Sequence, residues 1–175
     1  MDSSLAMDNS QVNSIGFGGG CHWCTEAVFQ SLRGVQKTEQ GWIASESPED
    51  YFSEAVIVHY KAQIIQLKDL ILAHLHTHSS MSKHSMRKKY RSAIYYFQSE
   101  DEQHAQQTIA DAQLDFPDPI VTRVLPFSQF KSSPEQYQNY YRKNSERPFC
   151  KTYITPKFQT LMKNFHQHYQ EVEIF

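Results

Sequence analysis

Residues 15–34 read IGFGGGCHWCTEAVFQSLRG. A short apolar run, Ile15 to Phe17, enters three consecutive glycines, and Cys21 follows the last of them. Four apolar side chains then recur at helical spacing: Trp23, Ala27, Val28 and Leu32. Gly34 is a natural helix stop. The stretch therefore predicts a strand, a glycine turn and a helix whose N-terminus carries Cys21.

The rest of the chain alternates between strand-like and helix-like patterns. Extended segments are expected at 35–44, 54–60, 92–97 and 120–125. Helices are expected at 64–76, 100–114, 134–141 and 156–169. Ser99 and Glu102 have the spacing of a capping box, which would open the second of these helices. Strands interspersed with helices imply an α/β or α+β layered domain.

Length and composition indicate one globular domain. The chain has 175 residues, of which 39% are hydrophobic and 21% charged, so it can bury a core. Residues 1–13 are polar and acidic and predict a flexible tail, followed by a single domain at 14–170. No apolar stretch approaches the roughly 20 residues of a membrane helix, and the N-terminus lacks the pattern of a signal peptide. We therefore expect a cytoplasmic protein that does not bind membranes.

Charge argues against a nucleic-acid partner. The formal net charge is -2, whereas proteins that bind polyanions are usually basic. The one basic cluster is the run Arg87, Lys88 and Lys89 with Arg91. Its pattern favours a solvated or substrate-steering rim over a nucleic-acid patch.

Cys21 is the first candidate for chemistry. A helix N-terminus carries partial positive charge, which lowers the pKa of a thiol and favours the reactive thiolate. A buried, inert cysteine is the alternative. Cys21 and Cys24 also have the spacing of a redox pair, and three cysteines in a reducing compartment do not suggest a structural disulfide framework.

A zinc site is a further interpretation of the same cysteines, with Cys150 and several histidines as added ligands. His74, His76 and His78 have metal-like spacing. His74 and His78 would share one helix face, but no second cysteine pair is nearby. A solvated, histidine-rich surface is therefore the preferred interpretation, and no metal is expected.

At this point the sequence resembles a known family. The run GFGGGCHWCTEAVF at 16–29 closely resembles the signature of the peptide methionine sulfoxide reductase A family, usually G-C-F-W and often followed by C-T-E. Later blocks continue the resemblance in order: SEAVIVHY at 53–60, KKYRSAIYY at 88–96, YQNYYRKNSERPFC at 137–150 and TPKF at 155–158. The resemblance thus extends from Ile15 to about Phe165.

The resemblance implies a fold and an activity. The fold would be a two-layer α/β sandwich with a mixed sheet and a ferredoxin-like core. The activity would be reduction of the S epimer of methionine sulfoxide, free or in proteins, to methionine, a repair reaction under oxidative stress. No bound cofactor is implied; thioredoxin would be the external reductant, and the enzyme would be a monomer.

The resemblance also assigns roles. Cys21 matches the nucleophile that becomes a sulfenic acid, and Cys150 matches the resolving cysteine that closes a disulfide with it. Segment 143–153 reads as a loop that could bring them together. Trp23 matches the aromatic wall around the substrate methyl group. Glu54 matches the carboxyl that protonates the sulfoxide oxygen, and Tyr90 a hydroxyl that holds it.

Physical chemistry is consistent with an acid at position 54. The sulfoxide oxygen gains charge as the thiolate attacks, so a proton donor must face it. A glutamate held in an apolar pocket has its neutral form favoured and can donate. From the residues alone, the favoured interpretation of Glu54 is a solvent-facing strand residue. That of Tyr90 is a core aromatic with an anchored hydroxyl.

Several positions depart from the family pattern. His22 replaces the usual Phe and makes the methyl pocket more polar. The second oxygen-binding tyrosine is missing, with Tyr51 as a candidate replacement, and the family's Asp falls at Ser85. Cys24 is either a second thiol able to trap the sulfenic acid or a small buried residue. These departures leave an alternative open: a weakened or inactive relative that acts as a thiol redox sensor or binding protein.

Overall fold

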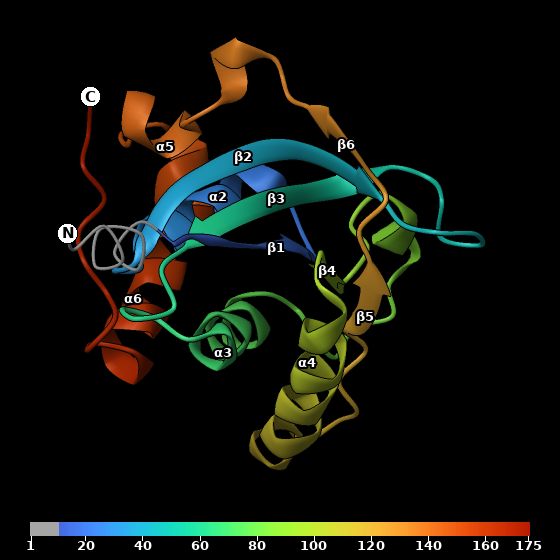
Figure 1. Cartoon of the computed structure of the whole chain (residues 1–175). Coiled ribbons are helices and arrows are strands. Elements are labelled where there is room, and N and C mark those ends of the chain that lie inside the picture. Colours follow the sequence, from blue (N-terminus) through green and yellow to red (C-terminus); the bar gives the residue numbers. More distant parts are fainter. Residues whose placement is uncertain (1–10) are drawn as a thin grey trace, which may run out of the picture.

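A six-stranded sheet forms the centre of the fold (Figure 1). The computed structural model describes residues 11–175, so most of the expected tail at 1–13 lies outside the described residues. The strands are β1 (Asn13–Gly18), β2 (Val35–Ala44), β3 (Ser53–Tyr60), β4 (Ala93–Tyr96), β5 (Arg123–Pro126) and β6 (Gln129–Ser132). Their order is β5-β4-β1-β3-β2-β6, in which β4 and β5 pair in parallel and all other neighbours pair antiparallel. The sheet is therefore mixed, as the sequence predicts.

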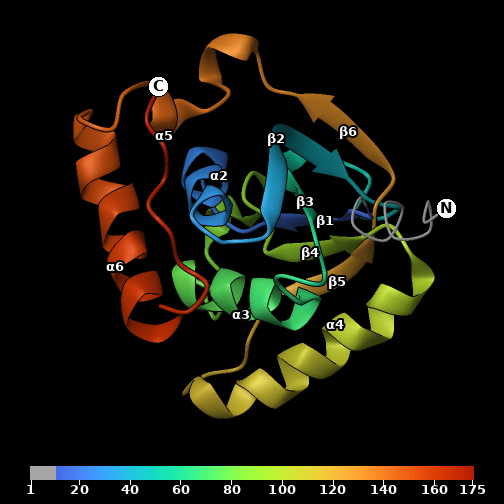
Figure 2. The same cartoon turned by 60° about the vertical axis from the view of Figure 1, so that its left-hand side comes forward.

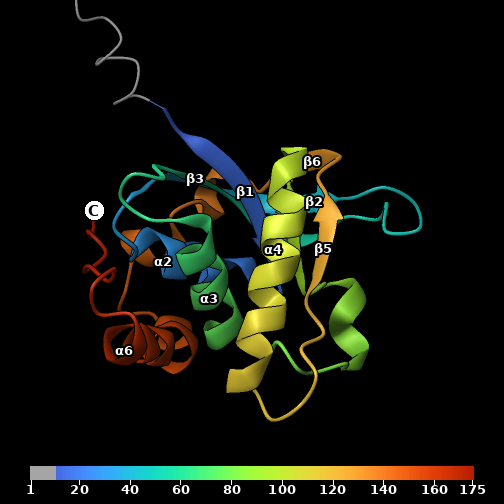
Figure 3. The ribbon, with the colours of Figure 1, turned by 60° about the horizontal axis from the view of Figure 1, so that its bottom comes forward.

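The helices gather on one side of this sheet (Figure 2). They are α2 (His22–Gln30), α3 (Leu67–Thr77), α4 (Ser99–Ala112), α5 (Tyr140–Lys143) and α6 (Thr155–Asn164). Short 3-10 turns occur at Ser85–Lys88, Gln113–Asp115 and Glu135–Tyr137, and a π-helical turn at Cys150–Ile154. The view from below shows α2, α3 and α4 beneath the sheet, with α6 outside α2 and α3 (Figure 3).

The central part of the chain has the ferredoxin-like arrangement expected from the resemblance. The elements β1, α2, β2, β3, α3 and β4 follow one another in the order βαββαβ. Their strands lie in the order β4-β1-β3-β2 and are antiparallel throughout. The later strands β5 and β6 extend this sheet at its two edges. The α/β class with a mixed sheet is confirmed.

Alternation along the strands divides the apolar side chains between two faces. On the helix face Ile15 and Phe17 of β1 are fully buried in the larger core cluster. Phe17 stacks on Phe29 of α2, with ring centroids 4.5 Å apart. The opposite face carries a smaller cluster that includes Ile43 and Tyr95. The Phe17–Phe29 contact fixes α2 against β1, and thus places the residue between them, Cys21.

The predicted capping box is wrong. Ser99 lies inside α4, the N-cap is Gln98, and no side chain caps this helix. A capping box occurs instead at the start of α3, where Gln66 and Asp69 exchange side-chain and backbone hydrogen bonds. That box begins α3 at Leu67, three residues later than the apolar periodicity predicts.

The expected C-terminal elements also need correction. The single helix predicted at 134–141 is divided into a 3-10 turn and α5, because Asn139 adopts a left-handed conformation with φ of 58°. The helix predicted at 156–169 ends at Asn164. Segment 143–153, expected as a loop, enters the π-helical turn at Cys150. Strand β6 was not expected from the sequence.

Candidate active site

The glycine turn brings Cys21 to the junction of β1 and α2. A Cβ atom on Gly18 would lie 2.9 Å from the backbone oxygen of Glu54 and 3.0 Å from that of Arg91, so only glycine fits between these chains. Cys21 is the N-cap residue of α2. Its carbonyl oxygen accepts hydrogen bonds from the backbone N–H groups of Cys24 and Thr25, at 3.1 and 3.2 Å. The sulfur is therefore held at the positive end of the helix.

The pKa of Cys21 is lowered, chiefly because the thiol of Cys24 donates a hydrogen bond to its sulfur. Burial raises this pKa, while the backbone N–H groups of Trp23 and Cys24 lower it, and the charge of Glu54 raises it. The same hydrogen bond, together with burial, raises the pKa of Cys24. Within this pair, the thiolate is therefore favoured at Cys21 and the thiol at Cys24.

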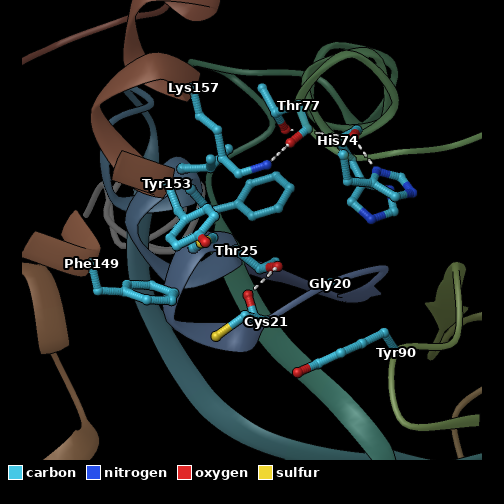
Figure 4. Close-up of a pocket in the computed structure, with 13 residues that line it drawn as sticks. Gly20, Cys21, Thr25, His74, Thr77, Tyr90, Phe149, Tyr153 and Lys157 are labelled. Atoms are coloured by element: carbon cyan, nitrogen blue, oxygen red, sulfur yellow. Dashed lines mark hydrogen bonds between the residues drawn. The ribbon is translucent and has the colours of Figure 1, made fainter. Parts of the chain in front are cut away.

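Both sulfurs border a cavity of about 280 Å³ between α2, α3 and α6 (Figure 4). Tyr90 lines it on one side, and Phe149 lines it from the C-terminal segment. Lys157 of α6 also lines it and donates a hydrogen bond to the carbonyl of Thr77. Burial lowers the pKa of Lys157, whereas the charges of Cys24 and Cys21 raise it. A cation without a carboxylate partner among the described residues thus faces the thiol pair.

Glu54 lies on β3 with only 8% of its surface exposed. The backbone N–H of His22 donates to its Oε1 atom at 3.1 Å. The His22 ring atom Nε2 lies 3.6 Å from the same oxygen, and Lys89 Nζ lies 3.9 Å from Oε2. Because Glu54 is bound to the first residue of α2, its carboxyl stands next to Cys21.

His22 supports this carboxyl and does not line the cavity of Cys21. Its Nδ1 atom donates to the carbonyl of Gly41 at 2.7 Å, and its ring packs edge-on against Trp42. Burial lowers the pKa of His22, against the opposing effect of the Glu54 charge. The neutral ring therefore presents an unprotonated Nε2 atom toward Glu54.

Trp23 is part of an aromatic cluster with the C-terminal segment. Its ring stacks on Tyr140 with centroids 4.1 Å apart and an interplanar angle of 6°. Phe149 contacts the Trp23 ring edge-on at 5.3 Å, and Tyr137 lies 5.8 Å away. These three aromatics were not predicted to be site residues, although all lie in the block 137–150 that carries the family resemblance. The high number of aromatic residues in this block is the sequence feature that could have indicated them.

Tyr90 and Tyr51, the two tyrosines predicted to bind the sulfoxide oxygen, line two different cavities. Tyr90 borders the cavity of Cys21, as described, and Lys89 Nζ lies 5.0 Å from its ring centroid. Tyr51 donates a hydrogen bond to Glu49, and its ring lies 4.6 Å from the guanidinium of Arg91. It lines a different cavity. Ser85 is exposed at the start of a 3-10 turn and lines neither cavity.

All three cysteines are free. Cys150 is fully buried in the π-helical turn that packs against α2, and its thiol donates to the carbonyl of Asn144 at 3.6 Å. Burial raises its pKa. Its charge also raises the pKa of Cys24, so these two thiols are electrostatic neighbours. Cys24, unlike Cys150, shares the cavity with Cys21.

The expectation of a solvated histidine surface is wrong for His74. Its side chain is 3% exposed, and its ring donates from Nε2 to the carbonyl of Gly18 at 2.9 Å. The ring stacks on His78 with centroids 4.1 Å apart.

Over residues 11–175, no group of three His, Cys, Asp or Glu side chains is placed to hold a metal ion. The same part of the chain has no helix long and apolar enough to span a bilayer.

Glu26 joins α2 to the C-terminal segment. Its carboxyl is 1% exposed and accepts hydrogen bonds from the side chain of Gln40 at 2.9 Å and from the backbone N–H groups of Asn139 and Tyr140 at 2.9 and 3.2 Å. Burial raises its pKa, and these hydrogen bonds oppose the shift. The carboxyl thereby places Tyr140 against the ring of Trp23.

We expect Glu26→Ala to destabilise the fold by about 3 kcal/mol, because it leaves several buried donors without an acceptor. Urea unfolding followed by circular dichroism measures this loss. The control is Glu173→Ala, an exposed carboxylate near the C-terminus, for which we expect a change within about 0.5 kcal/mol. Equal unfolding midpoints for the two variants would contradict this role of Glu26.

Comparison with known proteins adds independent information. The family model described as peptide methionine sulfoxide reductase matches residues 13–170. The peptide methionine sulfoxide reductase MsrA of Deinococcus radiodurans is 37% identical over 165 residues, covering 85% of this chain and 80% of that protein. The family model thus extends over the described site.

Solved structures agree on the fold. Mxr1 from Saccharomyces cerevisiae in reduced form matches with a TM-score of 0.73 at 21% identity, covering 82% of this chain and 92% of that one. Mxr1 in complex with Trx2 matches with a TM-score of 0.61 at 20% identity, covering 75% and 86%. At these identities the likeness establishes the shared fold.

Proposed function

The chain belongs to the peptide methionine sulfoxide reductase family, and on that premise we propose that Cys21 is the nucleophile. The reaction is the thiol-dependent reduction of methionine sulfoxide to methionine. One observation carries the assignment: the Cys21 sulfur is stabilised as thiolate at a helix N-terminus and borders the cavity. Neither Cys24 nor Cys150 has a lowered pKa.

In the first step the Cys21 thiolate attacks the sulfoxide sulfur. Glu54 gives its proton to the oxygen, which would otherwise carry the developing charge. The oxygen is then transferred, so that Cys21 becomes a sulfenic acid and methionine leaves. The substrate sulfur gains two electrons, and the Cys21 sulfur loses two. The backbone N–H of His22 and the ammonium of Lys89 hold the Glu54 carboxyl in place for this transfer.

Substrate binding follows from the surrounding side chains. We propose that the aromatic cluster around Trp23 accepts the methyl group and that Tyr90 holds the sulfoxide oxygen. A site that fixes methyl, oxygen and sulfur separately distinguishes the two sulfoxide epimers, and the family resemblance favours the S epimer. The substrate is methionine sulfoxide, free or in proteins.

Recycling requires a second thiol. We propose that Cys150 condenses with the sulfenic acid, releasing water and forming a disulfide, which the two thiols of thioredoxin reduce. The complex of Mxr1 with Trx2, on the same fold, supports thioredoxin as the reductant. One observation favours Cys24 in the resolving role instead: its thiol already donates a hydrogen bond to the Cys21 sulfur.

Three free thiols fit a reducing compartment, so we propose that the enzyme acts in the cytoplasm. We also propose that it acts as a monomer without a bound cofactor.

A burst experiment and a peptide map together test the function and the choice of thiol. With the S epimer, and thioredoxin as the reductant, we expect Cys150→Ser to release one equivalent of methionine and then stop, because the sulfenic acid has no partner and no disulfide forms for thioredoxin to reduce. The R epimer should release none. Peptide mapping of the unaltered protein after substrate, without reductant, should find Cys21 joined to Cys150.

Two results would revise this scheme. A Cys21–Cys24 disulfide in the peptide map would make Cys24 the resolving thiol. Continued thioredoxin-dependent turnover by Cys150→Ser, abolished when Cys24→Ser is added, would lead to the same conclusion. Absence of methionine release from both epimers would contradict the proposed function itself.

A further inference from the structure

A second cavity of about 280 Å³ lies beside the 82–92 segment, next to the loop that joins β2 to β3. It is lined by five cationic side chains: Lys83, Arg87, Lys88, Arg91 and Arg123. Among the described residues, Glu49 is the only carboxylate that lines it. This concentration of positive charge contrasts with the net charge of the whole chain, which is -2.

Glu49 is already paired. Arg123 Nη1 lies 2.6 Å from its Oε2 atom, and Arg91 Nη1 lies 3.7 Å from its Oε1 atom. Arg91 is buried and gives its other donors to the carbonyls of Ile43 and Tyr51 and to the hydroxyl of Tyr95. Glu49 therefore already has two arginine partners, and these three side chains form one ion-paired cluster in the lining of the cavity.

The remaining three cations have no counter-charge among the described residues. Arg87 directs its guanidinium only at backbone carbonyls: those of Gly19, Ser79, Ser82 and Tyr90. Lys83 and Lys88 are exposed and form no ion pair with a described residue. Ser85, which stands where the resembling family has an Asp, brings no carboxylate to this segment.

The cationic cavity and the active site share a border. Arg87 Nη1 donates to the carbonyl of Gly19, at 3.0 Å, and to that of Tyr90, at 2.9 Å. Gly19 belongs to the turn that leads into Cys21, and Tyr90 lines the Cys21 cavity. A polypeptide whose oxidised methionine reaches Cys21 therefore passes the cations with its neighbouring residues.

We propose that this cationic cavity binds acidic side chains that flank the methionine sulfoxide, so that the enzyme prefers acidic segments of oxidised proteins. The inference rests on the proposed function. The cavity is large enough for a carboxylate side chain, and opposite charges raise both the encounter rate and the affinity at low salt. The attraction weakens as salt shortens the screening length, because Lys83 and Lys88 are exposed.

Three peptides test the preference, with methionine sulfoxide flanked on both sides by Glu, Gln or Lys. At about 20 mM salt we expect kcat/KM to be about tenfold higher for the Glu peptide than for the Lys peptide, mainly through KM. At about 300 mM salt the ratio should fall toward one. The double variant Lys83→Glu with Lys88→Glu should lose or reverse the preference and keep its activity on the Gln peptide.

The matched control reverses two exposed lysines on other helices, Lys68 of α3 and Lys163 of α6. It changes the net charge equally, so a preference retained here assigns the effect to the cavity. Binding of the same peptides to Cys21→Ser, by fluorescence polarisation, separates recognition from turnover. Equal kcat/KM for the three peptides would overturn the proposal and leave the proposed function standing. A binding preference without any turnover would support the cavity and contradict the proposed function.

Discussion

Replacing Cys21 with serine should reduce methionine sulfoxide turnover below detection while leaving the fold intact. The Cys21 sulfur reacts as a thiolate, which the hydrogen bond from Cys24 and the start of α2 stabilise. A serine hydroxyl is not ionised near neutral pH and cannot attack the sulfoxide sulfur. Methionine release with dithiothreitol as the reductant measures this loss without any contribution from the recycling thiols.

Cys24→Ser is the control for this variant. It keeps a hydrogen-bond donor beside Cys21 and should retain most of the first-turnover rate. The pH dependence of alkylation adds a check on the thiolate: with its pKa lowered, Cys21 should react with iodoacetamide at a lower pH than Cys24 or Cys150, whose pKa values are raised. Substantial turnover by Cys21→Ser would rule out the mechanism.

Glu54→Gln should lower kcat/KM on the order of 10²-fold, the usual contribution of a general acid. Glutamine keeps the shape and can still accept the hydrogen bond from the His22 backbone, but it has no acidic proton for the sulfoxide oxygen. The thiolate itself should be preserved, because the hydrogen bond from Cys24 and the start of α2, which stabilise it, are unchanged in this variant. Steady-state kinetics with the S epimer measures the effect.

Glu39→Gln provides a comparison for Glu54→Gln. Glu39 lies on β2 and pairs with His59, away from Cys21, so its replacement should leave kcat/KM within about twofold. Normal turnover by Glu54→Gln would reduce Glu54 to a buried strand residue. A loss confined to KM would assign it to substrate binding alone.

The sequence predicts those parts of the fold that depend on local patterns. β1, the start of α2 and the bounds of β2 follow from apolar periodicity and from glycine, which act over a few residues. The start of α4 was misassigned because Ser99 has the right chemistry for a cap but lies one residue inside the helix. The capping box of α3 was not predicted because its N-cap residue is a glutamine, Gln66, whereas the preferred N-cap residues are Ser, Thr, Asp and Asn.

Features that depend on distant contacts were not predictable in the same way. His74 was predicted to be a surface residue, but it is buried, and its ring binds the Gly18 carbonyl at the end of β1, a contact between residues 56 positions apart. Lys157 and Phe149 reach the cavity from the C-terminal segment, and no local pattern indicates that they would meet Cys21. The motif supplied Cys21, Glu54 and Tyr90 as candidates but not the residues that surround them.

The buried carboxyl of Glu26 couples two distant parts of the chain. It accepts a hydrogen bond from the backbone N–H of Asn139, which is 113 residues away and adopts a left-handed conformation. A substitution of Glu26 leaves this N–H without its acceptor, and a residue at position 139 that disfavours the left-handed conformation moves the N–H away from the carboxyl. Because the two residues share this contact, the stability changes caused by substitutions at Glu26 and at Asn139 are expected to be non-additive.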